Sequence, residues 1–222
     1  NISASPFHDN QWEIRQKLIK NKVQETKTPF IYCNVVGAQD ELIFDGNSVV
    51  YNNNGEVIGL GKSFSEDLII VDMDSANIIA GQKVSREETL YSALCLGVKD
   101  YFIKTGHKKA VMGLSGGIDS SLTACIAVDA LGKENIWGIT MPSEFSSDHS
   151  LTDAEKLAQN LEISLKSIPI EKLVSETLQS LKLLFKDAPS NVAEENIQAR
   201  LRGLLLMAIS NKFGWLVLTT GN

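Results

Sequence analysis

The sequence predicts an α/β protein in which a strand-rich first part precedes a parallel sheet that helices cover on both faces. Up to about residue 75, short apolar runs are separated by polar turns, as in a strand meander. From residue 86 onward, apolar runs of strand length alternate with segments whose apolar residues recur at helical spacing. Strands that alternate with helices build a parallel sheet, and ligands then bind at the carboxyl ends of its strands.

The first part, residues 1–75, is predicted to hold one helix, around Ile14 to Val23, and a meander of short strands. Asn52-Asn53-Asn54-Gly55 is typical of a hairpin turn, because asparagine and glycine tolerate positive φ. Asp40-Glu41 and Asp45-Gly46 are interpreted as turns rather than as catalytic carboxylates. Strands are expected at Phe30 to Val36, which we predict to be buried, and at Leu42 to Phe44, Ser48 to Tyr51, Val57 to Leu60 and Leu68 to Asp72.

A domain boundary is expected where the pattern changes from strand alternation to helix. The segment from Asp74 to Ser85 is small and polar, so we predict a linker over residues 76–85 and a second domain over residues 86–222. The second domain should open with an amphipathic helix from Arg86 to Thr105. Strands are then expected at Val111 to Leu114, Asn135 to Met141, Ile163 to Ile168 and Trp215 to Leu218, and helices after Asp119 and at Asp153 to Leu161, Ile170 to Phe185 and Glu194 to Phe213.

Composition excludes several classes of protein. The chain of 222 residues is 43% hydrophobic, enough for a sizeable core, and its net charge of −6 without a basic stripe argues against a dedicated nucleic-acid binder. We expect no signal peptide, and the sequence contains no apolar run of about 18 residues that could span a bilayer. Cys33, Cys95 and Cys125 form no metal-binding spacing and are expected to be buried, reduced thiols of a cytoplasmic protein.

The stretch from Ala110 to Ser121, AVMGLSGGIDSS, is predicted to run from a buried strand through a glycine loop into a helix. Two successive glycines let the backbone approach an anion, and the free N–H groups of a helix N-terminus attract phosphate oxygens. Asp119, Ser120 and Ser121 are good helix-entry residues, and Asp119 becomes useful beside phosphate if a divalent metal lies between them. Neither a P-loop nor a dinucleotide-binding glycine motif is present. An ordinary glycine-rich turn is the alternative.

Two further polar stretches could contribute to a nucleotide site. The segment from Met141 to Ser147 follows the second strand of the sheet and would lie beside the glycine loop, although hydroxyl-rich loops also cap helices. Asn196, Ala199 and Arg200 share one face of the long helix, where a solvated charged face is the alternative. The histidines have no metal-ligand spacing and are assigned surface or capping roles.

Several of these stretches resemble one group of enzymes. Ser115-Gly116-Gly117-Ile118-Asp119-Ser120 is similar to the pyrophosphate loop of the ATP pyrophosphatases, which activate a carboxylate or carbonyl by adenylation. The segments Met141 to Ser143, Asn196 to Arg200 and Leu218 to Asn222 resemble the glutamine-dependent NAD synthetases more closely. The segments at residues 1–8 and 36–46 look like the closing third of that family's nitrilase-type glutaminase domain, so the resemblance spans the whole chain.

The resemblance implies a fold, a reaction and a set of binding residues. The fold would be the end of a nitrilase-like α/β sandwich followed by a doubly wound, Rossmann-like ATP pyrophosphatase domain. ATP and Mg²⁺ would activate deamido-NAD as an adenylate, and ammonia from glutamine would convert it to NAD. Asp119 would bind magnesium, Asn196 and Arg200 would bind deamido-NAD, and Ser5 and Gln11 would bind glutamine. ATP would contact Gly113, Leu114, Ser115, Gly116, Gly117, Ile118, Asp119, Ser120, Met141 and Thr220.

The chain also departs from the family pattern. Gln11 stands where the family usually has a basic residue, which leaves its role open. The glutaminase triad is expected upstream of Asn1, and a second magnesium carboxylate and a lysine are expected beyond Asn222, so we expect the chain to be a fragment. A homo-oligomer is expected. The alternatives are another ATP-pyrophosphatase-type amidotransferase, such as GMP synthetase, and a non-catalytic nucleotide-binding module.

Overall fold

The computed structural model describes residues 1–73, 77–79, 84–143, 148–186, 188–189 and 191–220. It divides into two compact units, Asn1–Tyr101 and Phe102–Asn222, which we call unit 1 and unit 2 and describe one at a time. Their division falls within helix α2 (Arg86–Thr105), whose bounds match the predicted helix. The boundary expected at residues 76–85 stays a prediction. No helix of the described residues is long and apolar enough to cross a membrane.

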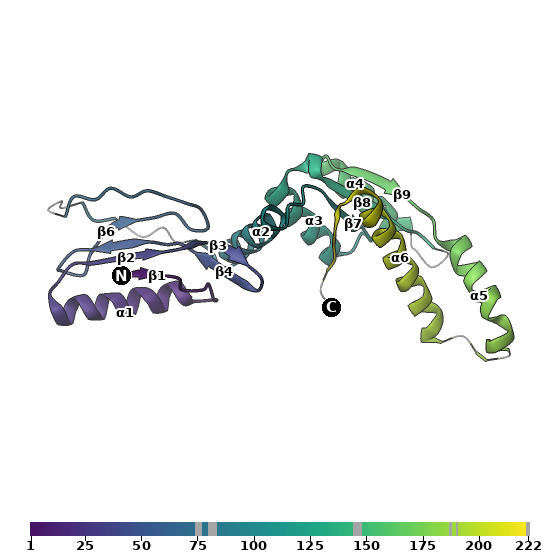
Figure 1. Cartoon of the computed structure of the whole chain (residues 1–222), viewed down its shortest axis with the longest axis horizontal. Helices are drawn as coiled ribbons and strands as arrows, with labels where there is room; N and C mark the ends of the chain where they lie inside the picture. The colour runs from purple at the N-terminus through teal and green to yellow at the C-terminus, as the bar shows by residue number, and fades with distance from the viewer. Residues whose placement is uncertain (74–76, 80–83, 144–147, 187, 190, 221–222) are drawn as a thin grey trace. The chain divides into compact units, whose positions relative to one another are not determined.

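Unit 1 is built from short strands, helix α1 and the greater part of α2 (Figure 1). A sheet with the strand order β1-β2-β5-β6 lies beside the separate hairpin β3-β4. Strand β1 pairs parallel to β2, whereas the β2–β5 and β5–β6 pairs are antiparallel. The elements are β1 (Ile2–Ser3), α1 (Gln11–Thr26), β2 (Phe30–Asn34), β3 (Val36–Gln39), β4 (Leu42–Asp45), β5 (Val49–Tyr51) and β6 (Val57–Leu60).

The hairpin predicted at Asn52 to Gly55 is confirmed. The side-chain oxygen of Asn52 accepts hydrogen bonds from the backbone N–H groups of Asn54 and Glu56, at 3.0 and 2.9 Å. Gly55 closes the turn with a φ of 80°, which glycine adopts without steric cost. Strands β5 and β6 on either side of this turn are thereby brought into antiparallel register.

The core of unit 1 forms where α1 packs on the sheet. Ile19 and Val23 lie one helical turn apart and pack against Tyr32, Val49 and Tyr51. Val23 and Val49 are fully buried, and burial of each such side chain contributes about 1.5–3 kcal/mol. Packing on the sheet therefore stabilises α1.

Three expectations for the first part were wrong. Strand β2 was expected to be buried, but it alternates, with Tyr32 and Asn34 inward and Cys33 exposed; a strand with one covered face turns every second residue outward. Leu68 to Asp72 forms no strand. Asp45 is not a turn residue: it ends β4 and is buried, with Arg15 as its partner.

Unit 2 contains the predicted parallel sheet, in the order β10-β7-β8-β9. Every strand pair in it is parallel, and Val111 of β7 lies level with Trp137 of β8 and Val217 of β10. The α/β class and the parallel sheet are confirmed. The elements that follow α2 are β7 (Ala110–Gly113), α3 (Ile118–Leu131), a 3-10 turn (Lys133–Asn135), β8 (Ile136–Thr140), α4 (Asp148–Asn160), β9 (Ser164–Ser167), α5 (Glu171–Phe185), α6 (Val192–Phe213) and β10 (Leu216–Leu218).

Helices cover both faces of this sheet because the connections run in opposite directions from β7. Helices α3 and α4 lead from β7 to β8 and β9, whereas α5 and α6 lead back to β10 on the other side of β7. Val111 and Ile139 pack with Ile170 and with Leu206 of α6. Met112, next to Val111, is buried on the opposite face. The sheet is therefore doubly wound, as predicted.

Helix ends account for the remaining differences from the predicted bounds. Helix α4 begins at Asp148, whereas the predicted helix began at Asp153. The prediction missed the first turn because that turn is polar and carries no apolar periodicity. Helix α6 begins with a capping box, in which Asn191 accepts from the N–H of Ala193 at 2.8 Å and donates its own N–H to Glu194 at 2.8 Å. It ends at Gly214, whose φ is 67°.

Candidate nucleotide site

The glycine loop lies at the point where the direction of the sheet reverses. Strand β7 is flanked by β8, reached through α3, and by β10, reached last along the chain. Leu218, at the end of β10, lies level with Met112, so the residues after both strands emerge at the same edge. In open α/β sheets this switch point is where ligands bind. The predicted ATP residues from Gly113 to Ser120 therefore begin with the last residue of β7 and lie at the edge where a ligand is expected.

The loop is held by its own serines and by close contact with α4. Ser115 Oγ and Ser120 Oγ lie 3.2 Å apart, and the N–H of Gly117 donates to Ser115 Oγ at 3.3 Å. Ser120 Oγ also donates to the carbonyl of Gly117 at 2.9 Å. Gly116 has a φ of 76°, and a Cβ there would lie 2.3 Å from the carbonyl oxygen of Ser150. Only glycine fits this position, so the loop is pressed against the first turn of α4.

The N-terminus of α3 offers amides to an anion. The N-cap is Gly117, which has no side-chain cap hydrogen bond. Residues 119–121 were expected to begin the helix, but it begins earlier, at Ile118. The amides of the first turn have no intrahelical acceptor, and the dipole is positive at this end. Asp119, in the first turn, is exposed; its backbone carbonyl accepts from Thr123 Oγ1 at 2.9 Å, but its carboxylate makes no hydrogen bond or ion pair with any described residue. Its carboxylate is available to a cation.

The carbonyl end of β8 is fixed by an arginine that the sequence did not single out. Arg202 Nε donates to the carbonyl oxygen of Met141 at 3.2 Å, across 61 residues of sequence. Burial lowers the pKa of Arg202, because desolvation disfavours its charged form. A Cβ at Gly113 would lie 3.4 Å from Met141 Cε, so the side chain of Met141 adjoins the end of β7. The structure thus brings Met141 and the glycine loop together, while residues 144–147 lie outside the described residues.

The other predicted residues of unit 2 follow β10 or lie near the start of α6. Thr220 is exposed beyond the end of β10, and Gly221 and Asn222 lie outside the described residues. Asn196 and Arg200 are exposed near the start of α6, where Arg200 Nη1 donates to the carbonyl of Asn196 at 3.1 Å. Helices α5 and α6 run side by side away from the sheet (Figure 1). No described contact joins Asn196 or Arg200 to the glycine loop.

The predicted glutamine residues both lie in unit 1. Ser5 follows β1, and its N–H donates to Asn34 Oδ1 at 2.9 Å. Gln11 is the first residue of α1 and is half-buried, and its N–H donates to the carbonyl of His8 at 3.0 Å. Sequence reasoning missed Arg15, one helical turn beyond Gln11, whose Nη2 donates to Ser5 Oγ at 3.3 Å. An arginine on the apolar face of an otherwise amphipathic helix was the signal that could have found it.

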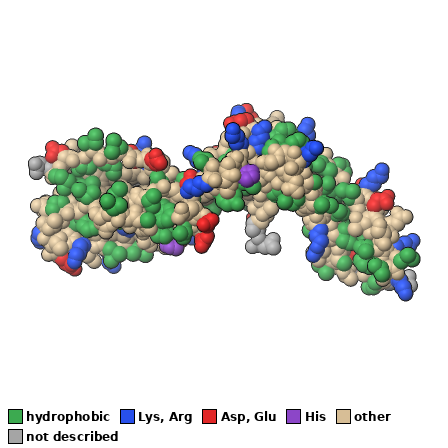
Figure 2. All heavy atoms as spheres, in the orientation of Figure 1, with side chains coloured by type: hydrophobic (Ala, Val, Ile, Leu, Met, Phe, Trp, Pro, Cys, Tyr) green, Lys and Arg blue, Asp and Glu red, His purple; other side chains and the backbone are tan. Residues whose placement is uncertain are grey.

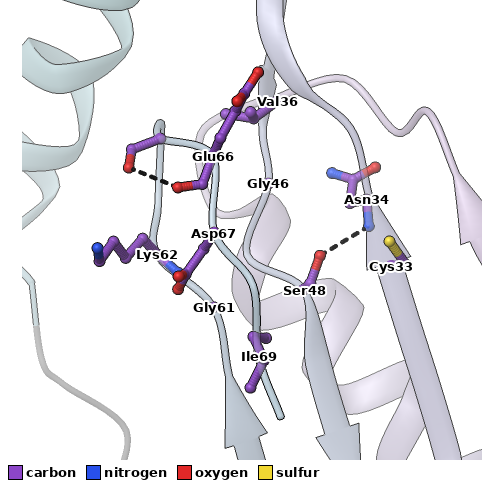
Figure 3. A pocket seen from close by; sticks show the side chains of 11 residues that line it. Cys33, Asn34, Val36, Gly46, Ser48, Gly61, Lys62, Glu66, Asp67 and Ile69 are labelled. Carbon is purple, nitrogen blue, oxygen red and sulfur yellow. Dashed lines mark hydrogen bonds between the residues drawn. The ribbon is translucent and has the colours of Figure 1, made fainter.

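Unit 1 also contains a cavity of about 290 Å³ (Figure 3). None of the predicted site residues lines it. Asn34 lines the cavity and also hydrogen-bonds to Ser5 through its side chain. The N–H of Asn34 donates to Ser48 Oγ, another lining residue, at 3.1 Å. Its lining consists of Cys33, Asn34, Val36, Gly46, Ser48, Gly61, Lys62, Ser65, Glu66, Asp67 and Ile69.

The donor set of unit 2 fits a magnesium ion bound together with phosphate. The described residues contain no cluster of three or more His, Cys, Asp or Glu side chains that could hold a metal by themselves. Magnesium is usually bound by one or two carboxylates, several waters and the phosphate oxygens of the substrate. One exposed carboxylate, that of Asp119, beside a phosphate-accepting loop meets this requirement.

A doubly wound sheet with a glycine loop and an open helix N-terminus at its switch point defines a nucleotide-binding α/β domain. The chain belongs to the NAD synthase family, whose family model matches residues 90–222.

Similar proteins cover the whole of this chain. It is 50% identical to the glutamine-dependent NAD(+) synthetase of Synechocystis and 42% identical to that of Thermotoga maritima, over 100% of this chain in both cases. A solved glutamine-dependent NAD(+) synthetase from Acinetobacter baumannii, in complex with adenosine diphosphate, superposes with a TM-score of 0.93 at 37% identity over 99% of this chain. The chain spans 41%, 45% and 43% of these three proteins, less than half of each.

Proposed function

We propose that this chain is part of an enzyme that amidates deamido-NAD to NAD at the expense of ATP, with ammonia supplied from glutamine. The names of its relatives support this reaction, and the relative from Acinetobacter baumannii was solved with an adenine nucleotide. A carboxylate is a poor electrophile, so its oxygen first attacks the α-phosphorus of ATP and expels pyrophosphate. Ammonia then attacks the carbonyl carbon, AMP leaves, and the nitrogen loses a proton.

The observation that carries the proposal is the glycine loop at the switch point of unit 2. The free amides at the N-terminus of α3 are suited to accept the negative charge that develops on the departing pyrophosphate. Ser115 and Ser120 already hydrogen-bond to each other and to the loop backbone, so their hydroxyls are pre-oriented. A preorganised donor costs no rearrangement at the moment of reaction.

Asp119 is proposed to hold Mg²⁺ beside this loop. When bound, the ion would neutralise charge on the phosphate oxygens. Met141 and Thr220, which follow β8 and β10, are proposed to contact ATP at the same sheet edge. Asn196 and Arg200 are proposed to bind deamido-NAD, because both are exposed polar side chains on the helix that also holds Met141 in place.

The glutaminase part of the proposal concerns unit 1. Ser5 and Gln11 are proposed to bind glutamine, and the half-buried position of both is compatible with a ligand contact. The free thiols of Cys33 and Cys125 support a cytoplasmic enzyme, because thiols stay reduced there.

The enzyme is also proposed to be a homo-oligomer. Leu204 and Met207 are 62% and 49% exposed and follow Arg200 at helical spacing, so they share one face of α6. Figure 2 displays hydrophobic side chains on the surface of the region that α5 and α6 occupy in Figure 1. A row of exposed apolar side chains on a long helix is typical of a protein contact.

The proposal is tested on the intact protein with ATP, Mg²⁺, deamido-NAD and ammonium. NAD and AMP are expected as products, and Asp119→Ala should lower the rate of NAD formation by at least about a hundredfold, because it removes the metal ligand. Asp129→Ala, on the same helix α3 but ten residues further on, is the matched control and should keep the rate.

Two results would contradict the proposal. Absence of NAD, with amidation of xanthylate or aspartate by the same preparation, would indicate another ATP-pyrophosphatase-type amidotransferase. An unaltered rate in Asp119→Ala would indicate that the loop binds a nucleotide without taking part in catalysis.

A further inference from the structure

Unit 1 contains a buried polar network centred on Arg15, a residue to which the proposed reaction assigns no role. Arg15 Nη1 and Nη2 donate to Asp45 Oδ2 and Oδ1, at 3.1 and 3.2 Å, in a bidentate ion pair. Arg15 is 5% exposed and Asp45 is 1% exposed. The guanidinium carbon also lies 5.1 Å from the centre of the Tyr32 ring, and Nε has no hydrogen-bond partner among the described residues. We call Ser5, Arg15, Asn34 and Asp45 the Arg15 network.

The Arg15 network ends on Ser5. Arg15 Nη2 donates to Ser5 Oγ at 3.3 Å as well as to Asp45. Asn34 binds the backbone of Ser5 on both sides: its Oδ1 accepts from the N–H of Ser5 at 2.9 Å, and its Nδ2 donates to the carbonyl of Ser5 at 3.3 Å. Asn34 Nδ2 also donates to Asp45 Oδ1 at 3.3 Å. Both the backbone and the hydroxyl of Ser5 are therefore fixed from the same buried cluster.

The chain just beyond Ser5 is fixed as well. The N–H of Phe7 donates to the carbonyl of Ile43 at 2.6 Å, and the Phe7 ring packs edge-on against Phe64 at 5.3 Å between ring centres. A buried ion pair is seldom needed for stability, since apolar side chains of similar volume can replace it without loss. A network that hydrogen-bonds to the N–H, the carbonyl and the hydroxyl of one half-buried serine has a geometric role instead.

The chemistry of the donors determines the direction of the Ser5 proton. A guanidinium has hydrogens to donate and no lone pair with which to accept, so Ser5 Oγ must accept the hydrogen bond from Arg15. The hydroxyl hydrogen of Ser5 remains available to donate, and the positive charge of Arg15 strengthens it as a donor. A ligand group at Ser5 must then be an acceptor, such as a carboxylate or amide oxygen.

We propose that Arg15 and Asn34 are positioning residues that hold Ser5 so that its hydroxyl donates to an oxygen of the substrate glutamine. The inference rests on the proposed function, in which Ser5 binds glutamine. Asp45 completes the arrangement, because it neutralises Arg15 and keeps the guanidinium from binding the substrate itself. Arg15 therefore acts through Ser5, not on the substrate.

The test is a double-mutant cycle in the intact protein, with NAD formation measured from glutamine and, separately, from ammonium. Arg15→Lys keeps the charge beside Asp45 but loses the planar guanidinium, whose Nη2 also donates to Ser5 Oγ. The KM for glutamine should therefore rise about tenfold. In a Ser5→Ala background the same substitution should change that KM by less than about twofold, because the residue it positions is gone. The ammonium-supported rate should be unchanged in Arg15→Lys.

Asn47→Gly is the matched control. Asn47 Nδ2 donates to Asp45 Oδ2 at 2.7 Å without contacting Ser5, and its φ of 52° suits glycine. It should leave the KM for glutamine unchanged, and Asn34→Ala should raise it.

The inference is overturned if Arg15→Lys raises the KM for glutamine equally with and without Ser5, or leaves it unchanged. Parallel loss of the glutamine and ammonium rates would also overturn it, because that is the signature of a structural role. Failure of the wild-type protein to form NAD from ammonium would refute the proposed synthetase function instead. In that case calorimetric glutamine binding by the same variants still decides the role of Arg15.

Discussion

At Gly116 the glycine loop approaches the first turn of α4 so closely that only a hydrogen side chain fits. Gly116→Ala would place a methyl group against the backbone of Ser150 and would force alanine to a φ of 76°. The positive φ costs about 1–2 kcal/mol, and the clash must in addition displace the loop. We expect the KM for ATP to rise by at least about tenfold in assays with ammonium.

Gly106→Ala separates these two effects. Gly106 has nearly the same φ, 75°, but open space where its Cβ would lie. It should lower the melting temperature and leave the KM for ATP unchanged. If Gly116→Ala also keeps its KM for ATP, the loop does not bind the nucleotide.

Tyr51 is the second residue whose environment gives a measurable prediction. Its side chain is buried in the core of unit 1, and burial raises its pKa above 10.0 because the phenolate is poorly solvated there. Above pH 10 the unfolded chain therefore loses the proton first, and the free energy of unfolding should fall as pH rises, by up to about 1.4 kcal/mol per pH unit. Urea denaturation of the wild type and of Tyr51→Phe between about pH 9 and 11 tests this.

Tyr51→Phe should show a smaller decline than the wild type in that range. Tyr101→Phe, at an exposed tyrosine, is the control and should behave as the wild type does. Equal slopes in all three proteins would contradict the assignment of the decline to Tyr51.

At the scale of elements, one arginine connects α6 to the end of β8. Arg202→Ala removes the hydrogen bond to the carbonyl of Met141 and leaves that carbonyl without its charged donor. We expect the KM for ATP to rise about tenfold, with kcat at saturating ATP nearly unchanged, because the loss affects binding before chemistry. Steady-state kinetics with ammonium as the nitrogen source measures both constants.

Lys212→Ala is the control for this substitution. Lys212 lies in the last turn of the same helix and is exposed. A KM for ATP that is the same in Arg202→Ala as in the wild type would mean that the end of β8 does not contact the nucleotide.

At the scale of the whole molecule, self-association is expected to involve the exposed face of α6. The double substitution Leu204→Glu, Met207→Glu places two charges on this exposed apolar face of α6. We expect light scattering of the variant to give the molar mass of a monomer. The wild type should scatter as a multimer. Gln159→Glu, which adds a carboxylate on α4, should leave the mass unchanged. A monomeric wild type would contradict the proposal.

Local patterns in the sequence determined the elements and the nucleotide loop. Helix α2 was predicted with the bounds that it has, and the glycine loop was predicted between β7 and α3, because turn chemistry and periodicity act over a few residues. These features depend on neighbours in sequence.

Only the tertiary structure decided the partners of buried polar groups. Asp45 was interpreted as a turn residue because its partner Arg15 lies 30 residues away, and Arg202 went unnoticed because Met141 is 61 residues away. Likewise Leu68 to Asp72 is apolar but finds no strand to pair with, and Cys33 points outward because only one face of β2 is covered. A buried charge or a strand edge is satisfied by whatever the fold brings beside it, and no local pattern specifies that neighbour.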